Sequence, residues 1–425
     1  MERGGLWATG WGRTTVWLSL ALGCTGAGAG MLAADFEDYL NHDFGGFTVQ
    51  PQMDVSEAYT DNLTYSQGAG RIAELQSTLS PGVRIQRGDG QSDRGFLEFM
   101  HDETLFLDHS NFDYRQEHLK ASAHITTARV TLEPLENYEK LSGFLGGVIG
   151  QSGVINFAPR RRDVWSGTLR ATYLWTERTR VYGDFSHYQT DWAPDVPLYD
   201  YNTLRGALGG SYEATDRIQV FGEAFYGQSG VVANQRLQTP GVASATYGSF
   251  VGARGEFTSR FSGTAKVGVE VRDFFQQGRS SVLIPAFDLD LRFQFTEATL
   301  SMLQYSRRTS PSLNLGGQNV TSDAISLITS HSLDGAGIWM VRSTIAYQMA
   351  NYDNTAVAPR PSTARVDDFA TAELGLYYQP RPWFTTSTGY AFEYYHVNFA
   401  NPLLALRNLS GYQANRVFVN LSLGF

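Results

Sequence analysis

Hydrophobic and polar residues alternate with a period of two along most of the chain. In residues 261–272 (FSGTAKVGVEVR), Val267 and Val269 share one face, whereas Lys266 belongs to the other. Residues 287–295 (FDLDLRFQF) repeat the same pattern. A period of two indicates β-strands, because successive side chains of a strand point to opposite faces. The pattern alone does not separate a soluble β-sandwich from a barrel.

The connections between these runs alternate between short and long. Tight turns at one end and longer polar loops at the other are typical of an outer-membrane barrel. Short turns are predicted at 88–93, 125–129, 176–179, 213–217, 258–260, 296–299, 333–337 and 379–382. Longer stretches lie at 139–160, 189–199, 228–243, 308–320, 351–365 and 396–411.

The count of strand-like runs is about 18, beginning near Phe47 and ending at Phe425, with 16 as the alternative. An even number returns both ends of the barrel to the periplasmic side. Lipid offers the backbone no hydrogen-bond partner, so a sheet that crosses a membrane must close on itself. We therefore predict an all-β fold, a transmembrane antiparallel up-and-down β-barrel over residues 46–425.

The N-terminal segment, residues 1–34, is interpreted as a signal peptide that is cleaved. It contains two arginines, then the apolar run 16–23 (VWLSLALG), then small residues up to Ala34. That run is too short for a membrane anchor, which needs about 20 apolar residues. The mature chain then contains no cysteine, since Cys24 is the only one. Residues 35–45 are assigned to a short periplasmic segment.

Composition and charge narrow the class of protein. Aromatic residues make up 13% and the mean hydropathy is only -0.25, which favours strands over membrane helices. Without residues 1–34 the chain has 31 basic and 41 acidic side chains, a net charge of -10. Such an acidic chain is not expected to bind nucleic acid. The predicted location is the outer membrane of a Gram-negative bacterium.

A barrel of 16 to 18 strands leaves a water-filled channel, so its inward-facing charged residues are candidates to line a pore. Neither sign of charge dominates among them, which predicts weak selectivity. The alternative is that these charges only pair across neighbouring strands. The pore-lining candidates are Arg84, Lys120, Arg170, Arg205, Glu223, Arg254, Lys266, Glu270, Arg272, Asp288, Asp290, Arg292 and Glu373.

The chain ends inside its most regular alternation, residues 416–425 (RVFVNLSLGF). A terminus normally frays unless it is held on both sides, and a closed barrel holds its last strand in this way. The apolar positions of this strand are expected to form a signal for the barrel assembly machinery. They are Val417, Val419, Leu421, Leu423 and Phe425.

The longest connection, residues 139–160, is unusually apolar for an exposed loop. It either folds back into the mouth of the barrel and narrows it, or extends two strands above the membrane. Arg160, Arg161 and Arg162 follow it. They either bind the phosphates of lipopolysaccharide, with which arginine makes bidentate contacts, or remain solvated.

The sequence gives little support for a catalytic function. The motifs HExxH, GxxxxGK[ST] and GxSxG are absent from the sequence. The pairs worth testing as hydrolase components are His331 beside Ser330 and His187 near Asp184, because such sites can be assembled from separate strands. We expect no enzymatic activity, no cofactor and no metal.

Several short motifs resemble those of a β-barrel porin family whose genes often accompany exopolysaccharide biosynthesis and secretion. They are SEAYTDNLTYS (56–66), LSPGVRIQ (79–86), YSRRTS (305–310) and VFVNLSLGF (417–425). The resemblance spans nearly all of residues 46–425. It implies an outer-membrane barrel that passes a polysaccharide to the exterior together with a periplasmic export protein, and it implies no catalytic residues.

The expected function is therefore a porin-like conduit in exopolysaccharide export. The alternatives are a diffusion porin for small solutes, a structural or adhesive barrel, and an outer-membrane hydrolase. Expected partners are outer-membrane lipids, lipopolysaccharide, the barrel assembly machinery, a periplasmic polysaccharide export protein, and the transported polysaccharide or solutes.

Overall fold

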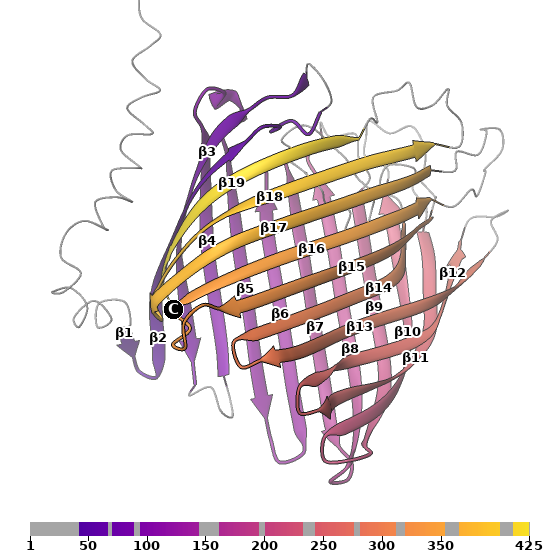
Figure 1. Ribbon diagram of the computed structural model, residues 1–425. Coiled ribbons are helices and arrows are strands. Elements are labelled where there is room, and N and C mark those ends of the chain that lie inside the picture. Colours follow the sequence, from indigo (N-terminus) through magenta and orange to yellow (C-terminus); the bar gives the residue numbers. More distant parts are fainter. Residues whose placement is uncertain are drawn as a thin grey trace, which may run out of the picture.

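The computed structural model describes residues 42–66, 70–88, 94–143, 161–194, 200–232, 243–275, 281–311, 319–352, 365–399 and 411–424. These residues form one antiparallel sheet of 19 strands. From β2 to β19 each strand pairs with the next, and β19 pairs with β2, so 18 strands close into a barrel (Figure 1). This confirms the predicted all-β up-and-down barrel of about 18 strands.

The strands are 12 to 17 residues long, apart from the short β1. One 3-10 helix, η2 (Ser110–Phe112), lies between β4 and β5. Within the described part of the chain, no helix is long and apolar enough to cross a membrane. The strand bounds are β1 His42–Phe44, β2 Phe47–Thr60, β3 Glu74–Arg87, β4 Arg94–Phe106, β5 Tyr114–Thr126, β6 Val130–Leu141, β7 Arg162–Leu174, β8 Thr179–Trp192, β9 Asp200–Glu213, β10 Ile218–Val232, β11 Ala243–Thr258, β12 Phe261–Phe274, β13 Val282–Thr296, β14 Thr299–Pro311, β15 Asn319–Ser332, β16 Trp339–Tyr352, β17 Arg365–Arg381, β18 Phe384–Phe399 and β19 Tyr412–Leu423.

The short turns lie at one end of the barrel, here called the turn end, where the chain also finishes (Figure 1). Three of these turns contain the same side-chain hydrogen bond. The hydroxyls of Thr127, Thr176 and Thr215 each accept a hydrogen bond of 3.0 Å from the backbone N–H three residues further on. A threonine in this position closes the turn through its own side chain. The longer connections lie at the opposite end, here called the loop end.

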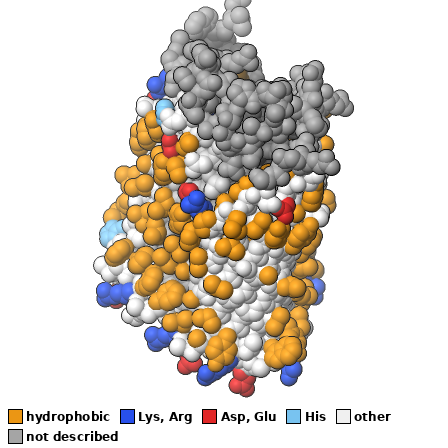
Figure 2. Space-filling model, turned by 90° about the vertical axis from the view of Figure 1, so that its right-hand side faces the viewer, with side chains coloured by type: hydrophobic (Ala, Val, Ile, Leu, Met, Phe, Trp, Pro, Cys, Tyr) orange, Lys and Arg blue, Asp and Glu red, His pale blue; other side chains and the backbone are white. Residues whose placement is uncertain are grey.

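The two faces of the sheet differ as the alternation predicts. On β12 the outward Val269 is 47% exposed, whereas the neighbouring Glu270 is 8% exposed. Figure 2 shows one side of the barrel, where hydrophobic side chains cover most of the wall and charged side chains gather at the lower rim. An apolar outer wall around a charged interior is the arrangement of a barrel surrounded by lipid.

Prolines interrupt the ladder within the wall. Pairing of β3 with β4 skips Ser80 and Pro81, and pairing of β5 with β6 skips Glu133 and Pro134. Proline has no N–H to donate, which removes one hydrogen bond at each place. Both prolines lie well inside their strands, so the gaps are local and the registers continue on either side.

The barrel closes along a short seam between β19 and β2. Eight pairs join these strands, from Thr60 to Met53 of β2, whereas fourteen join β2 to β3. At the other end of this edge of β2, residues 47–49 pair with β1. Gly45 and Gly46 form the connecting turn with φ of 56° and 88°, a region that glycine adopts without strain. The segment assigned to the periplasm from sequence thus adds a strand.

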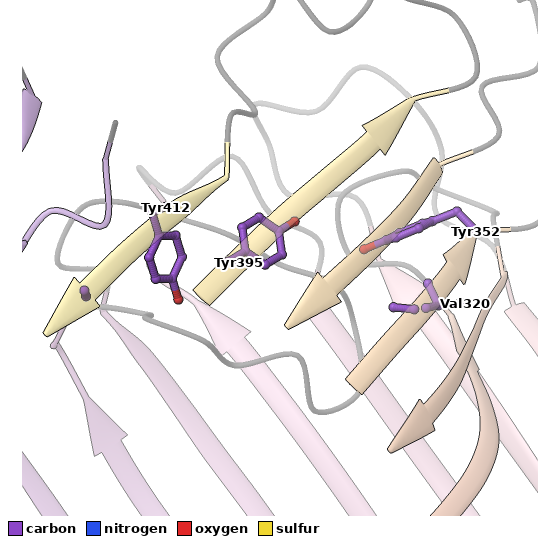
Figure 3. Packing of buried hydrophobic residues seen from close by; sticks show 6 residues of the cluster. Val320, Tyr352, Tyr395 and Tyr412 are labelled. Carbon is purple, nitrogen blue, oxygen red and sulfur yellow. The ribbon is translucent and has the colours of Figure 1, made fainter. Parts of the chain in front are cut away.

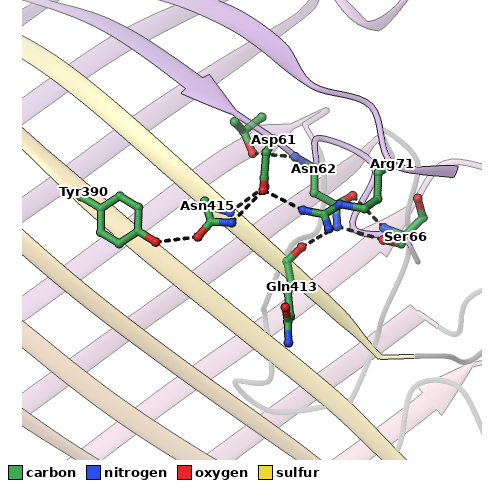
Figure 4. A network of polar contacts seen from close by, with 8 residues as sticks. Asp61, Asn62, Ser66, Arg71, Tyr390, Gln413 and Asn415 are labelled. Atoms are coloured by element: carbon green, nitrogen blue, oxygen red, sulfur yellow. Dashed lines mark hydrogen bonds and ion pairs between the residues drawn. The ribbon is translucent and has the colours of Figure 1, made fainter. Parts of the chain in front are cut away.

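A polar network reinforces the seam (Figure 4). The Asp61 carboxylate accepts hydrogen bonds of 2.7 Å from the backbone N–H of Asn415, from its side-chain amide and from the Arg71 guanidinium. The Asn62 amide donates to the carbonyl of Gln413 at 2.7 Å. These bonds tie the connection after β2 directly to β19, where the ladder itself is short.

Aromatic side chains fill the interior of the loop end along β16 to β19. Tyr352, Tyr395 and Tyr412 are all buried there (Figure 3), and the rings of Tyr395 and Tyr412 stack with centroids 5.6 Å apart. The Arg365 guanidinium bonds the Asp367 carboxylate at 2.5 and 2.6 Å and the Tyr395 hydroxyl at 3.1 Å. The pairing satisfies both buried charges. On this side the mouth of the barrel is packed.

Candidate functional site

Two cavities adjoin on the inner wall of the barrel. The first has a volume of about 850 Å³ and reaches the turn end at Arg87 and Gly88. The second has a volume of about 520 Å³ and reaches the loop end at Thr309 and Ser310. Both are lined by Arg205, together with other residues of β6 to β9. Together they follow the inner wall from one end of the barrel towards the other.

Positive charge exceeds negative charge in both cavities. Each is lined by five arginine or lysine residues and two carboxylates, although the whole chain has a net charge of -9. The even balance expected from sequence is therefore not what lines the two cavities. The first holds Arg84, Arg87, Arg94, Arg170 and Arg205 with Glu133 and Asp184, and the second holds Arg205, Lys266, Arg272, Arg307 and Arg308 with Glu270 and Asp288.

Several of these cations, and also Arg254 of the same wall, lie over aromatic rings. A ring face attracts a cation and holds the side chain in one orientation without neutralising its charge. The wall from β7 to β12 therefore presents positioned cations on an apolar support. The pairs are Arg170 over Tyr182 at 5.4 Å, Arg205 over Phe225 at 4.4 Å, Arg254 over Phe221 at 5.9 Å and Lys266 over Phe250 at 5.0 Å.

Carboxylates on neighbouring strands offset part of this charge. The Arg170 guanidinium makes two hydrogen bonds to the Asp184 carboxylate, at 2.6 and 2.9 Å. The Lys266 ammonium lies 3.7 Å from the Asp288 carboxylate. Cross-strand pairing, the alternative interpretation of the sequence, thus applies to these residues. Arg84, Arg205 and Arg307 pair in the same way with Glu98, Glu223 and Asp323, which line neither cavity, so the excess of positive charge is smaller than the lining residues alone suggest.

Arg205 stands where the two cavities meet. Its guanidinium donates a long hydrogen bond of 3.4 Å to the Glu223 carboxylate. Its side chain is 37% exposed, whereas that of Glu223 is only 8% exposed. A solute moving from one cavity to the other passes this cation.

The loop end of the second cavity is narrowed by β14. Pairing of β13 with β14 stops at Phe287 and Arg307, before the end of either strand. Beyond that point the Thr309 hydroxyl donates to the Glu270 carboxylate of β12, and the Arg272 guanidinium donates to the Thr309 carbonyl at 3.2 Å. The end of β14 therefore leans inward across β13.

The apolar connection that was expected to narrow the mouth, 139–160, falls largely outside the described residues, which resume at Arg161. Arg160 is likewise outside them. Arg161 is exposed, but Arg162 is half-buried and lies over the Trp192 ring at 5.3 Å. Arg161 and Arg162 therefore do not form one outward basic patch.

All thirteen residues predicted to line a pore lie on the inner side of the sheet, as cross-strand pairing with inward neighbours requires. A third cavity at the turn end, of about 550 Å³, contains Arg254, Asp290 and Arg292. Lys120, Glu223 and Glu373 line none of the three cavities. The other seven line the first two: Arg84, Arg170, Arg205, Lys266, Glu270, Arg272 and Asp288.

Sequence reasoning missed Arg307 and Arg308 as cavity residues. Both belong to the YSRRTS motif, yet strand alternation can place only one of two neighbours inside. The inward lean of β14 brings both against the second cavity. The only feature of the sequence that could have indicated these two cavity residues is the presence of two adjacent arginines at the end of a predicted strand.

The apolar positions of the last strand face outward. Val417 and Val419 are exposed, and Leu421 and Leu423 pair with the outward Val55 and Met53 of β2. Phe425 lies outside the described residues.

Neither histidine pair considered for hydrolysis comes together. His331 and Ser330 are adjacent in β15 and point to opposite faces, and the His331 ring bonds the Thr299 hydroxyl at 2.9 Å. His187 lies on the outer side of β8, whereas Asp184 lies inside with Arg170. Among the described residues, no group of His, Cys, Asp and Glu side chains could hold a metal ion.

Comparison with known proteins returns solved structures only. No protein-family model matches the chain, and no curated protein sequence matches it. The family resemblance suggested by short motifs therefore gains no support from these searches.

The similar structures include three proteins of Pseudomonas aeruginosa. OccK2 (OpdF) is 10% identical, with 89% of this chain and 98% of that chain covered and a TM-score of 0.47. The outer membrane protein OpdK is 10% identical, with coverage of 89% and 99% and a TM-score of 0.45. The siderophore receptor PirA is 9% identical, with coverage of 88% and 80% and a TM-score of 0.43. These similarities are to the fold alone.

Proposed function

We propose that the protein is an outer-membrane channel through which small anionic solutes diffuse. The observation that carries this proposal is the pair of adjoining cavities, each with five cations and two carboxylates. Fixed cations in a low-dielectric wall raise the local concentration of anions and speed their entry. The apolar outer wall of the closed sheet supports a location in the outer membrane.

The dimensions favour small solutes over a polymer. Cavities of about 850 and 520 Å³ are in the range of sites for single small molecules. The loop end is narrowed by the Thr309–Glu270 contact on one side and packed by Tyr352, Tyr395 and Tyr412 on the other. No described residue favours the export of an exopolysaccharide, the function expected from the resemblance.

The carboxylates that pair with the cavity cations weaken the binding of a solute and so favour its release. A channel must bind its solute strongly enough to admit it and weakly enough to let it leave. Asp184 and Asp288 lie within 4 Å of cations in the two cavities and compete with the solute for them. We infer low affinity for each solute and a preference by charge.

Reversal potentials in planar bilayers under a salt gradient test the proposal. We expect the wild-type channel to prefer anions, and Arg205→Gln to reduce that preference because it removes the cation between the two cavities. Lys120→Gln is the matched control, since Lys120 lies on the inner side of the sheet but lines none of the three cavities. A wild-type protein that prefers cations, or does not conduct, contradicts the proposal.

A further inference from the structure

A cavity of about 580 Å³ opens on the outer wall of the barrel, over β8 to β11. Trp165 of β7 and Phe275, which follows β12, stand at its two sides, and both side chains are exposed. Phe185 and Leu204, which are also exposed, line the part nearer the turn end. The cavity therefore faces the surroundings of the barrel and not its lumen. Its volume is in the range of sites for single small molecules.

Small residues form the floor of this cavity and let an amide side chain lie across it. Gly230 of β10 is directly opposite Asn202 of β9 and Ala243 of β11. A Cβ at Gly230 would lie 2.5 Å from Asn202 Oδ1, so only glycine lets the Asn202 side chain take this position. The Gly230 N–H donates a hydrogen bond of 2.9 Å to Asn202 Oδ1. This bond fixes the orientation of the amide, because a backbone N–H can only donate.

A second amide lies beside the first. Gln189 of β8 is directly opposite Asn202, and its Nε2 donates a hydrogen bond of 2.7 Å to the Asp191 carboxylate. This amide is oriented as well, because an ionised carboxylate can only accept. Gln189 Oε1 is left as an acceptor and Asn202 Nδ2 as a donor, and no described residue bonds either atom. The cavity thus presents one acceptor and one donor on neighbouring strands.

The Trp165 side of the cavity is held by a carboxylate. Glu136 of β6 accepts a hydrogen bond of 3.1 Å from Trp165 Nε1, and the same oxygen lies 3.0 Å from Nε2 of His187, which also lines the cavity. The rings of Trp165 and His187 meet edge to face, with centroids 5.1 Å apart. Contacts within the chain thus hold this wall in place, and a preformed site costs less to occupy.

Carboxylates lie next to the two amides on the loop-end side. Asp191 and Asp200 are each two residues beyond an amide, about 7 Å along the strand. Asp163 of β7 is directly opposite Asp191. Lys140 offsets only part of this charge, because it stands between Asp163 and Glu117. This edge of the cavity is therefore acidic.

These groups define what a ligand needs. Hydrocarbon around the outer wall of a membrane barrel cannot bond the acceptor and the donor that the amides present. A ligand that satisfies both carries a donor and an acceptor side by side, as a secondary amide does. Its apolar part lies over Phe185 and Leu204, which are nearer the middle of the strands than the amides. Its head lies beside the carboxylates.

We propose that this cavity, here called the outer-wall site, binds a membrane lipid with an amide-linked acyl chain and a cationic head group. The amide N–H of the lipid donates to Gln189 Oε1, and its carbonyl accepts from Asn202 Nδ2. The chain runs over Leu204 towards the turn end. The head group reaches Asp191 and Asp200 at the loop end. The inference rests on the membrane location proposed above and not on the nature of the solute.

The same groups disfavour two other lipids. The chains of glycerophospholipids are esters, which accept hydrogen bonds but do not donate them, so Gln189 Oε1 would stay without a partner. Lipopolysaccharide has amide-linked chains, but its phosphates would lie beside Asp191 and Asp200, which repel them.

Urea unfolding of the protein in phosphatidylcholine vesicles, with added probes, tests the site. The first probe is the amide analogue of dodecanoylcholine. Dodecanoylcholine itself differs from it only in the ester linkage, and N-dodecanoylglycine keeps the amide but has an anionic head. A ligand that binds only the folded state raises the unfolding midpoint. We expect the amide analogue to do so at a concentration about tenfold below that of either other probe, since each lacks one interaction.

Gln189→Leu/Asn202→Leu keeps the approximate shape of both side chains and removes the acceptor and the donor. This variant should bind the amide analogue and dodecanoylcholine equally. Asn351→Leu is the matched control, since Asn351 is an amide on the outer side of β16 and should leave the tenfold difference intact. Asp191→Asn/Asp200→Asn keeps the amides and should remove only the preference for a cationic head.

Equal binding of the amide and ester probes by the wild type overturns the proposal, as does a preference for N-dodecanoylglycine or a midpoint that no probe shifts. A tenfold difference that persists in Gln189→Leu/Asn202→Leu also overturns it. Reversal potentials recorded in parallel show that each variant is folded and should equal that of the wild type, because the changes lie outside the lumen. A wild type that binds the probe without conducting refutes the proposed function alone, and one that prefers anions without binding the probe refutes the outer-wall site alone.

Discussion

Two outer walls of the same barrel differ in the side chains that they expose. From β14 to β17 the outward residues at mid-strand are bulky and apolar, such as Leu327, Ile345 and Leu374, and all three are exposed. From β5 to β9 the wall also carries exposed bulky residues, such as Leu169, Phe185 and Leu204, but in addition it has small residues around Leu208 and the outward pair of Glu136 and His187. Both walls alternate with a period of two, so they differ in which outward side chains they carry at mid-strand.

The energetics of the bilayer give the reason for this difference. A cation at the midplane on the lipid face of a barrel costs about 2–4 kcal/mol, whereas an apolar side chain there is favourable. The wall from β14 to β17 meets that requirement at mid-strand, because its outward carboxylates Asp323 and Asp368 lie towards the loop end. The wall from β5 to β9 departs from it at Glu136, whose carboxylate is bonded by Trp165 and His187 of the same wall.

The largest effect is expected from a charge on the apolar wall. Leu327→Arg, in the middle of β15, should destabilise the barrel by about 2–4 kcal/mol because the cation enters lipid. Ser326→Arg, one residue away, points inward and should cost far less. Urea unfolding of the two variants in lipid vesicles checks this. Equal losses of unfolding free energy would refute the assignment of faces.

Alternation alone would suggest a different control, Gly268, beside the outward Val269. The structure rejects it, because a Cβ at Gly268 would lie 2.0 Å from the Ser249 carbonyl oxygen. The period of the sequence predicts on which side a residue lies. It does not predict how close the neighbouring strand comes, since that distance depends on the twist and packing of two strands together.

For the same reason, the strands and their faces could be predicted from the sequence, whereas contacts between side chains of different strands could not. The alternation in residues such as 261–272 was sufficient to predict strands, faces and the inward set of charges. The Glu136–His187 contact joins residues 51 positions apart on β6 and β8, across β7, and depends on Gly167 being free of a side chain. Contacts of this kind follow from register between strands, which no local pattern contains.

An intermediate effect is expected at Gly167. Gly167→Ala places a methyl group where the Glu136 carboxylate lies, and should displace that carboxylate from Trp165 and His187. Loss of a hydrogen bond to a charged group typically costs about 1.5–3 kcal/mol when buried, and we expect about 1–2 kcal/mol at this half-exposed site. The unfolding free energy in vesicles measures it. Gly206→Ala is the control, since its methyl group would meet open space; an equal cost there would contradict the argument.

The smallest effect is expected from shortening an outward leucine. Leu208→Ala should change the unfolding free energy of the single barrel by less than about 0.5 kcal/mol, the usual range for surface substitutions. Leu374→Ala on the apolar wall removes the same atoms from an exposed side chain. Urea unfolding of both variants in lipid vesicles checks this, and we expect both losses of unfolding free energy to be small because both side chains are more than half exposed. A loss well above that range for Leu208→Ala alone would contradict the assignment of Leu208 to the outer surface.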